Sequence, residues 1–125
     1  MKKLFMMVIL LGLVTILVVA CGGDSTASGS YVVHMSDLNF VQPSITIPKG
    51  STITLTNDSS ALHIIANGSW ADGTAQPMQE SGAPTVNNVQ VSGNQSQDVG
   101  PFNTSGTYHL YCTVHPGMNL VVVVQ

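Results

Sequence analysis

The chain has 125 residues, of which 44% are hydrophobic and only 7% are charged, and its formal net charge is −3. Beyond Lys2 and Lys3 it has one basic residue, Lys49, against six acidic residues. So little positive charge cannot neutralise a phosphate backbone, which excludes nucleic acid as a partner. The length that follows residue 20 suits one small domain with a modest core.

The first predicted element is an export signal over residues 1–20. Two lysines precede an apolar run that ends just before Cys21, and this run is on the short side for a spanning helix. The stretch VVAC followed by GG resembles the lipobox of bacterial lipoproteins, and the resemblance implies cleavage before Cys21 and lipidation of Cys21. An uncleaved anchor helix, or an ordinary signal with a chance cysteine, remains an alternative. We expect the domain to be exported and held on the outer face of the cell membrane or in the periplasm.

Residues 21–30 are rich in Gly and Ser and are predicted to be a flexible tether. From residue 31 onward, short segments of alternating apolar and polar residues indicate half-buried strands. They are YVVHMS (31–36), two strands within 44–57 joined by a turn at Pro48-Lys49-Gly50, ALHIIAN (61–67), VNNVQVS (86–92), GTYHLYC (106–112) and NLVVVV (119–124). Residues 67–85 show no periodicity and are predicted to be a long loop with room for one helical turn.

About seven or eight strands, no amphipathic helix and regular turn signals predict an all-β fold, a Greek-key β-sandwich over residues 31–125.

The stretch YCTVHPGMNL places Cys112, His115 and Met118 within seven positions. A thiolate, an imidazole and a thioether together select copper over magnesium, calcium or manganese, and zinc has little use for a methionine. Cys112 has no evident disulfide partner if Cys21 is lipidated, and a bound metal explains an unpaired thiol in an exported chain. Two histidines, one cysteine and a weak axial methionine form the blue copper arrangement, so a second histidine is needed.

Three histidines are candidates for that second ligand. On the strand before the loop, residue 109 faces away from residue 112, so His109 points away from the site unless a bulge intervenes. His34 lies on the more polar side of its strand and is expected to face solvent. His63 begins an apolar strand after a loop that could turn it toward Cys112, and we predict that His63 is the second histidine.

The stretch SGTYHLYCTVHPGM closely resembles the C-terminal copper loop of the cupredoxins, the small blue copper proteins. The part before the cysteine resembles plastocyanin, and the C-x2-H-x2-M spacing resembles amicyanin. The segment IPKGSTITLTNDSSALH is similar to the segment that leads to the family's first histidine ligand. The resemblance implies one copper ion held by His63, Cys112, His115 and Met118.

One departure from the family concerns the residue after the first histidine. Family members commonly have Asn there, which ties the two ligand segments together through side-chain hydrogen bonds, whereas this chain has Ile64. The resemblance further implies electron exchange through His115 at an apolar surface and a second electron route at Tyr111, for which a plain surface tyrosine is the alternative. Trp70 and Met78 would either cover the site or pack in the core.

All four expected ligand positions are filled by protein, which favours electron transfer over catalysis, so we do not expect an enzyme. The sequence predicts a membrane-tethered, monomeric blue copper carrier that exchanges single electrons with redox proteins of an electron-transport chain. The alternative is a copper trafficking or storage module in which Met35 or Met78 helps Met118 to handle Cu(I). A copper oxidase would need further histidines, and a structural sandwich would leave the unpaired thiol unexplained.

Overall fold

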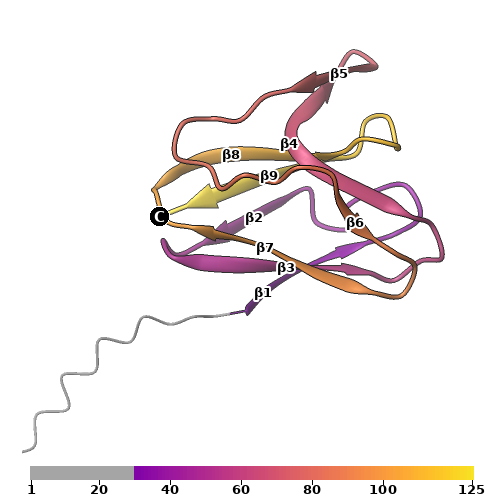
Figure 1. The fold of residues 1–125 in the computed structure, drawn as a ribbon, viewed down its shortest axis with the longest axis horizontal. Helices are drawn as coiled ribbons and strands as arrows, with labels where there is room; N and C mark the ends of the chain where they lie inside the picture. The colour runs from indigo at the N-terminus through magenta and orange to yellow at the C-terminus, as the bar shows by residue number, and fades with distance from the viewer. Residues whose placement is uncertain (1–29) are drawn as a thin grey trace, which may run out of the picture.

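The computed structural model describes residues 30–125, and the predicted signal peptide, Cys21 and nearly all of the predicted tether lie outside them. Within this range, nine strands form two sheets (Figure 1). They are β1 (Ser30–Met35), β2 (Ser44–Ile47), β3 (Ser51–Asn57), β4 (His63–Ala71), β5 (Thr74–Pro77), β6 (Val89–Val91), β7 (Ser96–Phe102), β8 (Gly106–Cys112) and β9 (Asn119–Val124). None of these residues belongs to a helix long and apolar enough to cross a membrane.

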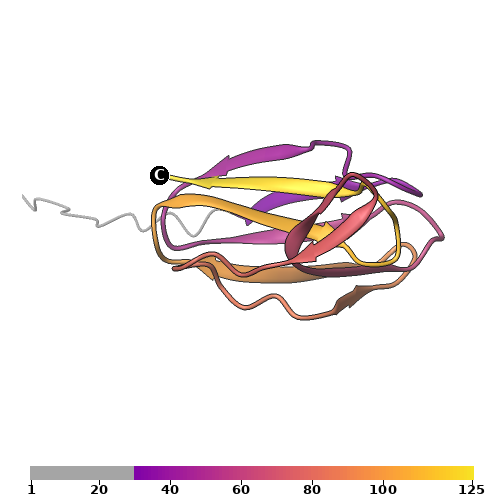
Figure 2. The same ribbon diagram turned by 90° about the horizontal axis from the view of Figure 1, so that it is seen from above.

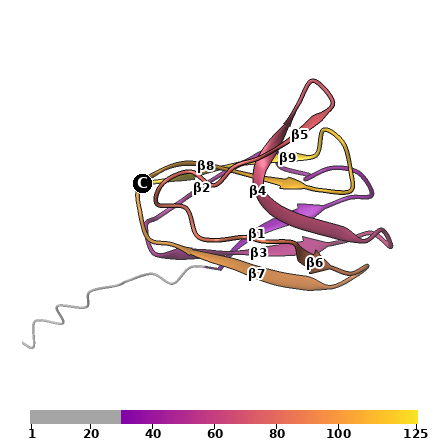
Figure 3. The same ribbon diagram turned by 45° about the horizontal axis from the view of Figure 1, so that its top comes forward.

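The two sheets lie face to face as a sandwich (Figures 2 and 3). The smaller sheet has the order β1-β3-β7, with β1 parallel and β7 antiparallel to β3. The larger sheet has the order β2-β9-β8-β4-β5, and β6 also pairs with β4. In it β2 runs parallel to β9, and the other pairs are antiparallel. The predicted β-sandwich is confirmed, with nine strands rather than seven or eight.

Strand alternation builds the core between the sheets. In β3 the odd-numbered residues 51–57 are buried and the threonines between them are half-buried. In β9 the even-numbered residues 120–124 are buried in the same way. Each fully buried aliphatic side chain adds about 1.5–3 kcal/mol to the stability of the fold relative to an exposed one. Since the apolar residues alternate, each strand is stable only with its apolar face turned toward the core.

The prediction of a long loop over residues 67–85 is wrong in its first half. Strand β4 continues to Ala71, turns at Asp72-Gly73 and returns as β5, with Ala71 paired to Thr74. Asp72 and Gly73 have φ values of 50° and 73°, as the mirror-image turns of tight hairpins require. The Asp-Gly pair is a sequence signal for a tight hairpin turn, but few apolar residues flank it, so the strand segments on either side were not predicted.

Strand β7 was also missed, because its sequence SQDVGPF is mostly polar and contains a Gly-Pro pair. A proline lacks the N–H that a central strand needs, and sheets accept it mainly in edge strands. Here β7 is the edge of the smaller sheet, and its Val99 and Phe102 still reach the core.

The β8–β9 loop and the start of β4 lie at one end of the sandwich (Figures 1 and 3). The C-terminus lies at the opposite end, and β1 begins toward that end too. The two segments that carry the predicted ligands are far apart in the sequence, and the fold brings them to the same end of the sandwich.

Candidate metal centre

The loop after β8 carries three of the four predicted ligands. Cys112 ends β8 with no exposed surface, His115 lies in the turn, and Met118 is buried just before β9. The Cys112 N–H donates to the Met118 carbonyl at 3.0 Å, and the Met118 N–H donates to the His115 carbonyl at 3.2 Å. Gly117 has a φ of 81°, which lets the chain turn back tightly. The main chain therefore closes this loop without help from a metal.

His63 enters the same site from the first position of β4, where it is fully buried. Its Nε2 lies 2.9 Å from the Ser36 carbonyl oxygen. A carbonyl can only accept, so Nε2 carries the proton and Nδ1 keeps a free lone pair. In many metal-binding histidines, a hydrogen bond from the ring nitrogen that does not bind the metal orients the ring.

Asn57 organises the loop that leads to His63. Its Nδ2 donates to the Ala61 carbonyl at 2.6 Å and also to the carbonyls of Val91 and Ser92. Its Oδ1 accepts hydrogen bonds from the Ser59 N–H and Oγ–H. One buried amide thus joins the end of β3, the loop before His63 and the end of β6.

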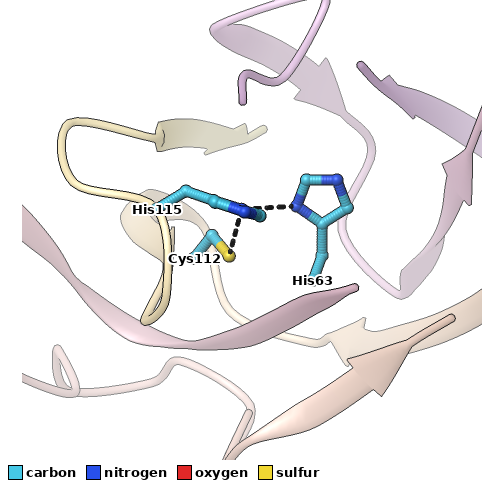
Figure 4. Close-up of side chains that lie close together, drawn as sticks. All are labelled: His63, Cys112 and His115. Carbon is cyan, nitrogen blue, oxygen red and sulfur yellow. Dashed lines mark hydrogen bonds between the residues drawn. The ribbon is translucent and has the colours of Figure 1, made fainter. Parts of the chain in front are cut away.

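Three donor atoms converge between these elements (Figure 4). The Cys112 Sγ lies 3.3 Å from the His115 Nδ1, which in turn lies 3.1 Å from the His63 Nδ1. The donor atoms of the three residues all lie within 4.8 Å of one another. Donors that share one ion at bond lengths of about 2.0–2.3 Å are separated by about 3–4 Å, so this cluster fits a single metal ion.

The electrostatics of the cluster favour a neutral His63. Burial lowers the pKa of His63, and the neighbouring His115 lowers it further. A lowered pKa keeps the ring unprotonated at neutral pH and its Nδ1 available to a metal. The donor set of a buried thiol and two imidazoles suits copper better than a hard cation.

The two rejected histidines lie outside the cluster, as predicted. His34 Nδ1 lies 2.6 Å from the Asp58 Oδ2 on the surface. His109 is on the other face of β8, where its Nδ1 lies 2.5 Å from the Glu80 Oε1. Strand parity was therefore a sound guide to which histidine reaches the site.

The expectation that Tyr111 could be a surface tyrosine is wrong, since its exposed fraction is 4%. Its ring packs edge-on against Trp70, with the ring centroids 6.0 Å apart. Tyr111 and the exposed Met78 line a groove of about 520 Å³ beside β4. Trp70 lies outside the buried core cluster, and its Nε1–H donates to the Cys112 carbonyl at 2.8 Å.

Two supporting residues, Asn57 and Asn119, escaped the sequence analysis, which named Trp70 but did not predict its contacts with the ligand loop. Asn57 had a signal, because it continues the inward-facing positions of β3 and a polar residue there needs buried partners. Trp70 and Asn119 had none, because their contact joins positions 49 residues apart in the chain.

The comparisons with known proteins agree with this geometry. The family model of copper binding proteins, plastocyanin/azurin family, matches residues 27–125. Amicyanin-alpha of Methylorubrum extorquens is 32% identical over 98 residues, which cover 78% of this chain and 74% of that protein.

Solved structures show the same fold. The crystal structure of amicyanin from Paracoccus versutus is 22% identical and has a TM-score of 0.60, covering 81% of this chain and 86% of that one. An amicyanin mutant in its reduced state is 24% identical and has a TM-score of 0.58, covering 81% and 87%. The chain belongs to the plastocyanin/azurin family of copper-binding proteins, the cupredoxins, and its cofactor is copper.

Proposed function

We propose that the chain is a membrane-tethered blue copper electron carrier in which His63, Cys112, His115 and Met118 hold one copper ion. The observation that carries this proposal is the cluster of a fully buried thiol and two imidazoles, with donor atoms within 4.8 Å of one another. When bound, copper supplies one-electron exchange between its Cu(I) and Cu(II) states. The family and its amicyanin relative support electron transfer as the general role.

The protein holds these side chains in place by hydrogen bonds that do not involve a metal. The Ser36 carbonyl fixes the His63 ring, and the main chain closes the loop from Cys112 to Met118. The Thr113 N–H also donates to the Ile64 carbonyl at 2.8 Å, which links the loop to β4. A site with ligands held in this way needs little rearrangement when an electron arrives or leaves.

His115 is the ligand that lies nearest to a partner in this proposal. It is only partly buried, and Leu62 and Val114 beside the two ligand segments are 44% and 48% exposed. The chain has few charges, so a partner redox protein would dock here mainly by apolar contact rather than by strong electrostatic steering.

A lipid anchor at Cys21 would suit this orientation. The strand that follows the tether begins toward the end of the sandwich that holds the C-terminus, and the β8–β9 loop lies at the other end (Figure 1). An anchored domain would therefore present His115 away from the membrane, toward redox partners.

The copper trafficking alternative is less well supported. A protein that hands copper on needs an exposed, exchangeable site, whereas His63, Cys112 and Met118 are all almost fully buried. Met35 is buried in the core, and Met78 lines the groove beside Tyr111.

The two roles are separated by a redox titration of the copper-loaded protein. An electron carrier takes up one electron per copper from ascorbate, returns it to ferricyanide, and keeps its copper through repeated cycles. Loss of copper to a chelator in either oxidation state, within the time of one cycle, would favour trafficking instead.

A further inference from the structure

One residue of the β4–β5 hairpin contacts both ends of the ligand loop. The Trp70 Nε1–H donates to the carbonyl oxygen of Cys112, the last residue of β8, at 2.8 Å. The Trp70 main-chain N–H donates to the Oδ1 of Asn119, the first residue of β9, at 2.7 Å. The Asn119 Nδ2–H donates back to the Trp70 carbonyl at 3.1 Å. These three hydrogen bonds span the loop from its start to its end.

Ordinary strand pairing does not produce these contacts. Strand β4 runs antiparallel to β8, with Ile65 opposite Cys112 and Asn67 opposite Leu110, so a straight β4 would carry Trp70 away from Cys112. Instead β4 bends near its middle, and the hairpin leans back toward the β8–β9 loop (Figure 1). Gly68, where the pairing of β4 passes from β8 to β5, has a φ of 130°, a conformation that L side chains rarely adopt.

The indole is itself held in place by its neighbours. Its ring meets the buried Tyr111 ring edge-on, at an interplanar angle of 82°. Trp70 is also part of the β4–β5 ladder, where it pairs with Ala75. The donor of the hydrogen bond to Cys112 is therefore rigid rather than a flexible surface group.

Within residues 30–125, these contacts and the one between His63 and His115 are the side-chain hydrogen bonds that link β4 to the ligand loop. Ile64, the residue after His63, has no polar side chain, and its carbonyl accepts a hydrogen bond from the Thr113 N–H of the loop. Trp70 lies on the same strand as His63, so its bonds to Cys112 and Asn119 tie the strand of one histidine to the loop of the other.

We propose that Trp70 and Asn119 form a clamp that fixes the ligand loop before copper binds, and that both are positioning residues for the copper site. The clamp's effect on copper rests on the proposed function, whereas its effect on the metal-free loop does not. A loop that is already ordered loses less conformational freedom on binding, so the clamp strengthens copper binding without touching the metal.

Two variants each remove one side of the clamp. Trp70→Phe keeps an aromatic ring against Tyr111 but removes the N–H that reaches Cys112. Asn119→Leu keeps the approximate size of the side chain but removes its hydrogen bonds with the N–H and the carbonyl of Trp70. Gln76→Ala on β5 is the matched control, because among residues 30–125 its side chain makes no hydrogen bond to the loop.

The first readout is amide hydrogen exchange in the metal-free protein. The amides of Cys112 and Met118 close the loop, and losing the one or two supporting hydrogen bonds that each variant removes should speed their exchange about three- to tenfold. The amides of β3 and the control variant should stay within about twofold of the unmodified protein.

The second readout is Cu(II) affinity, measured by competition with a chelator. We expect each variant to bind about tenfold more weakly, as is typical when residues that support metal ligands are lost. Both sides of the clamp hold the same loop, so the double variant should lose less than the product of the two single losses.

The outcomes separate the clamp from the proposed function. If the unmodified protein shows no blue copper spectrum, the proposed function fails, and exchange in the metal-free protein still decides whether the clamp exists. If loop exchange and copper affinity in both variants stay within twofold of the unmodified protein, the clamp is overturned. If Trp70→Phe does not fold, Asn119→Leu alone decides in the same way.

Discussion

At the residue scale, the cluster of donor residues was predictable from the sequence, and the residues that support it were only partly so. Cys112, His115 and Met118 stand close together in the sequence, and donor chemistry together with strand parity pointed to His63. Asn57 could have been found by extending the same parity argument one position further along β3. The five hydrogen bonds of its side chain hold the loop that leads to His63.

Replacing Asn57 should therefore weaken the whole fold. Asn57→Ala removes the donor from three carbonyl groups that are buried or part-buried, and we expect the free energy of unfolding of the metal-free protein to fall by about 2–3 kcal/mol. Urea unfolding followed by circular dichroism measures the change. Asn103→Ala, at an exposed position, is the control and should change stability by less than about 0.5 kcal/mol. Equal effects of the two substitutions would contradict the role given to Asn57.

The lowered pKa of His63 predicts how the metal-free protein responds to acid. Its folded-state pKa lies below the value near 6.5 of the unfolded chain, so the unfolded state takes up a proton more readily. The stability that a neutral His63 contributes is therefore present above pH of about 6.5 and is lost as the pH falls through the folded-state pKa. Unfolding free energies measured from pH 8 to pH 5 should fall more steeply for the unmodified protein than for His63→Phe. Parallel pH profiles would contradict this prediction.

At the element scale, the β4–β5 hairpin and β7 are the parts of the sheets that the alternation of apolar and polar residues did not predict. Alternation identified β3, β8 and β9, because each has one apolar face that must be buried. The hairpin projects from the sandwich (Figure 1) and has few apolar residues, so its position is fixed by turn geometry and by contact with a distant loop. Such contacts join segments far apart in the chain, and no local pattern predicts them.

Two glycines allow the hairpin to be tested. A Cβ at Gly68 would lie 2.3 Å from the Gln76 carbonyl oxygen, whereas one at Gly73 would meet nothing within 4 Å. Both residues have positive φ, so Gly73→Ala should cost about 1–2 kcal/mol and Gly68→Ala distinctly more. Trp70 is the only tryptophan of the chain, so its fluorescence reports on the hairpin. Its emission should shift to longer wavelength in Gly68→Ala alone, and similar spectra of the two variants would contradict the clash with β5.

At the scale of the whole molecule, β1 begins toward one end of the sandwich and the loop that carries Cys112 and His115 lies at the other end (Figure 1). The fold could be predicted from the sequence because short alternating strands in a chain of this size have few other ways to bury their apolar faces. The relative placement of the two ends could not, because it depends on the order of strands in both sheets. It agrees with a carrier that is held by one end and exchanges electrons at the other (Figure 1).

The predicted anchor is tested by Cys21→Ser in cells that express the full chain. Acyl chains hold a protein on a membrane by about 0.8 kcal/mol for each buried CH₂ group, so removing their attachment site should release the protein from the membrane fraction. Fractionation followed by immunoblotting measures the distribution. Retention of the variant in the membrane after a high-salt wash would contradict lipidation and would favour an uncleaved anchor helix.

The most direct test of the central claim is the visible spectrum of the purified protein with one equivalent of Cu(II), recorded beside that of Cys112→Ser. Our account predicts an intense thiolate-to-copper charge-transfer band that bleaches reversibly with ascorbate and is absent from the variant, because the buried Cys112 sulfur is the ligand that produces it. Only the faint bands of ordinary tetragonal copper, or the same spectrum in both proteins, would contradict a blue copper electron carrier.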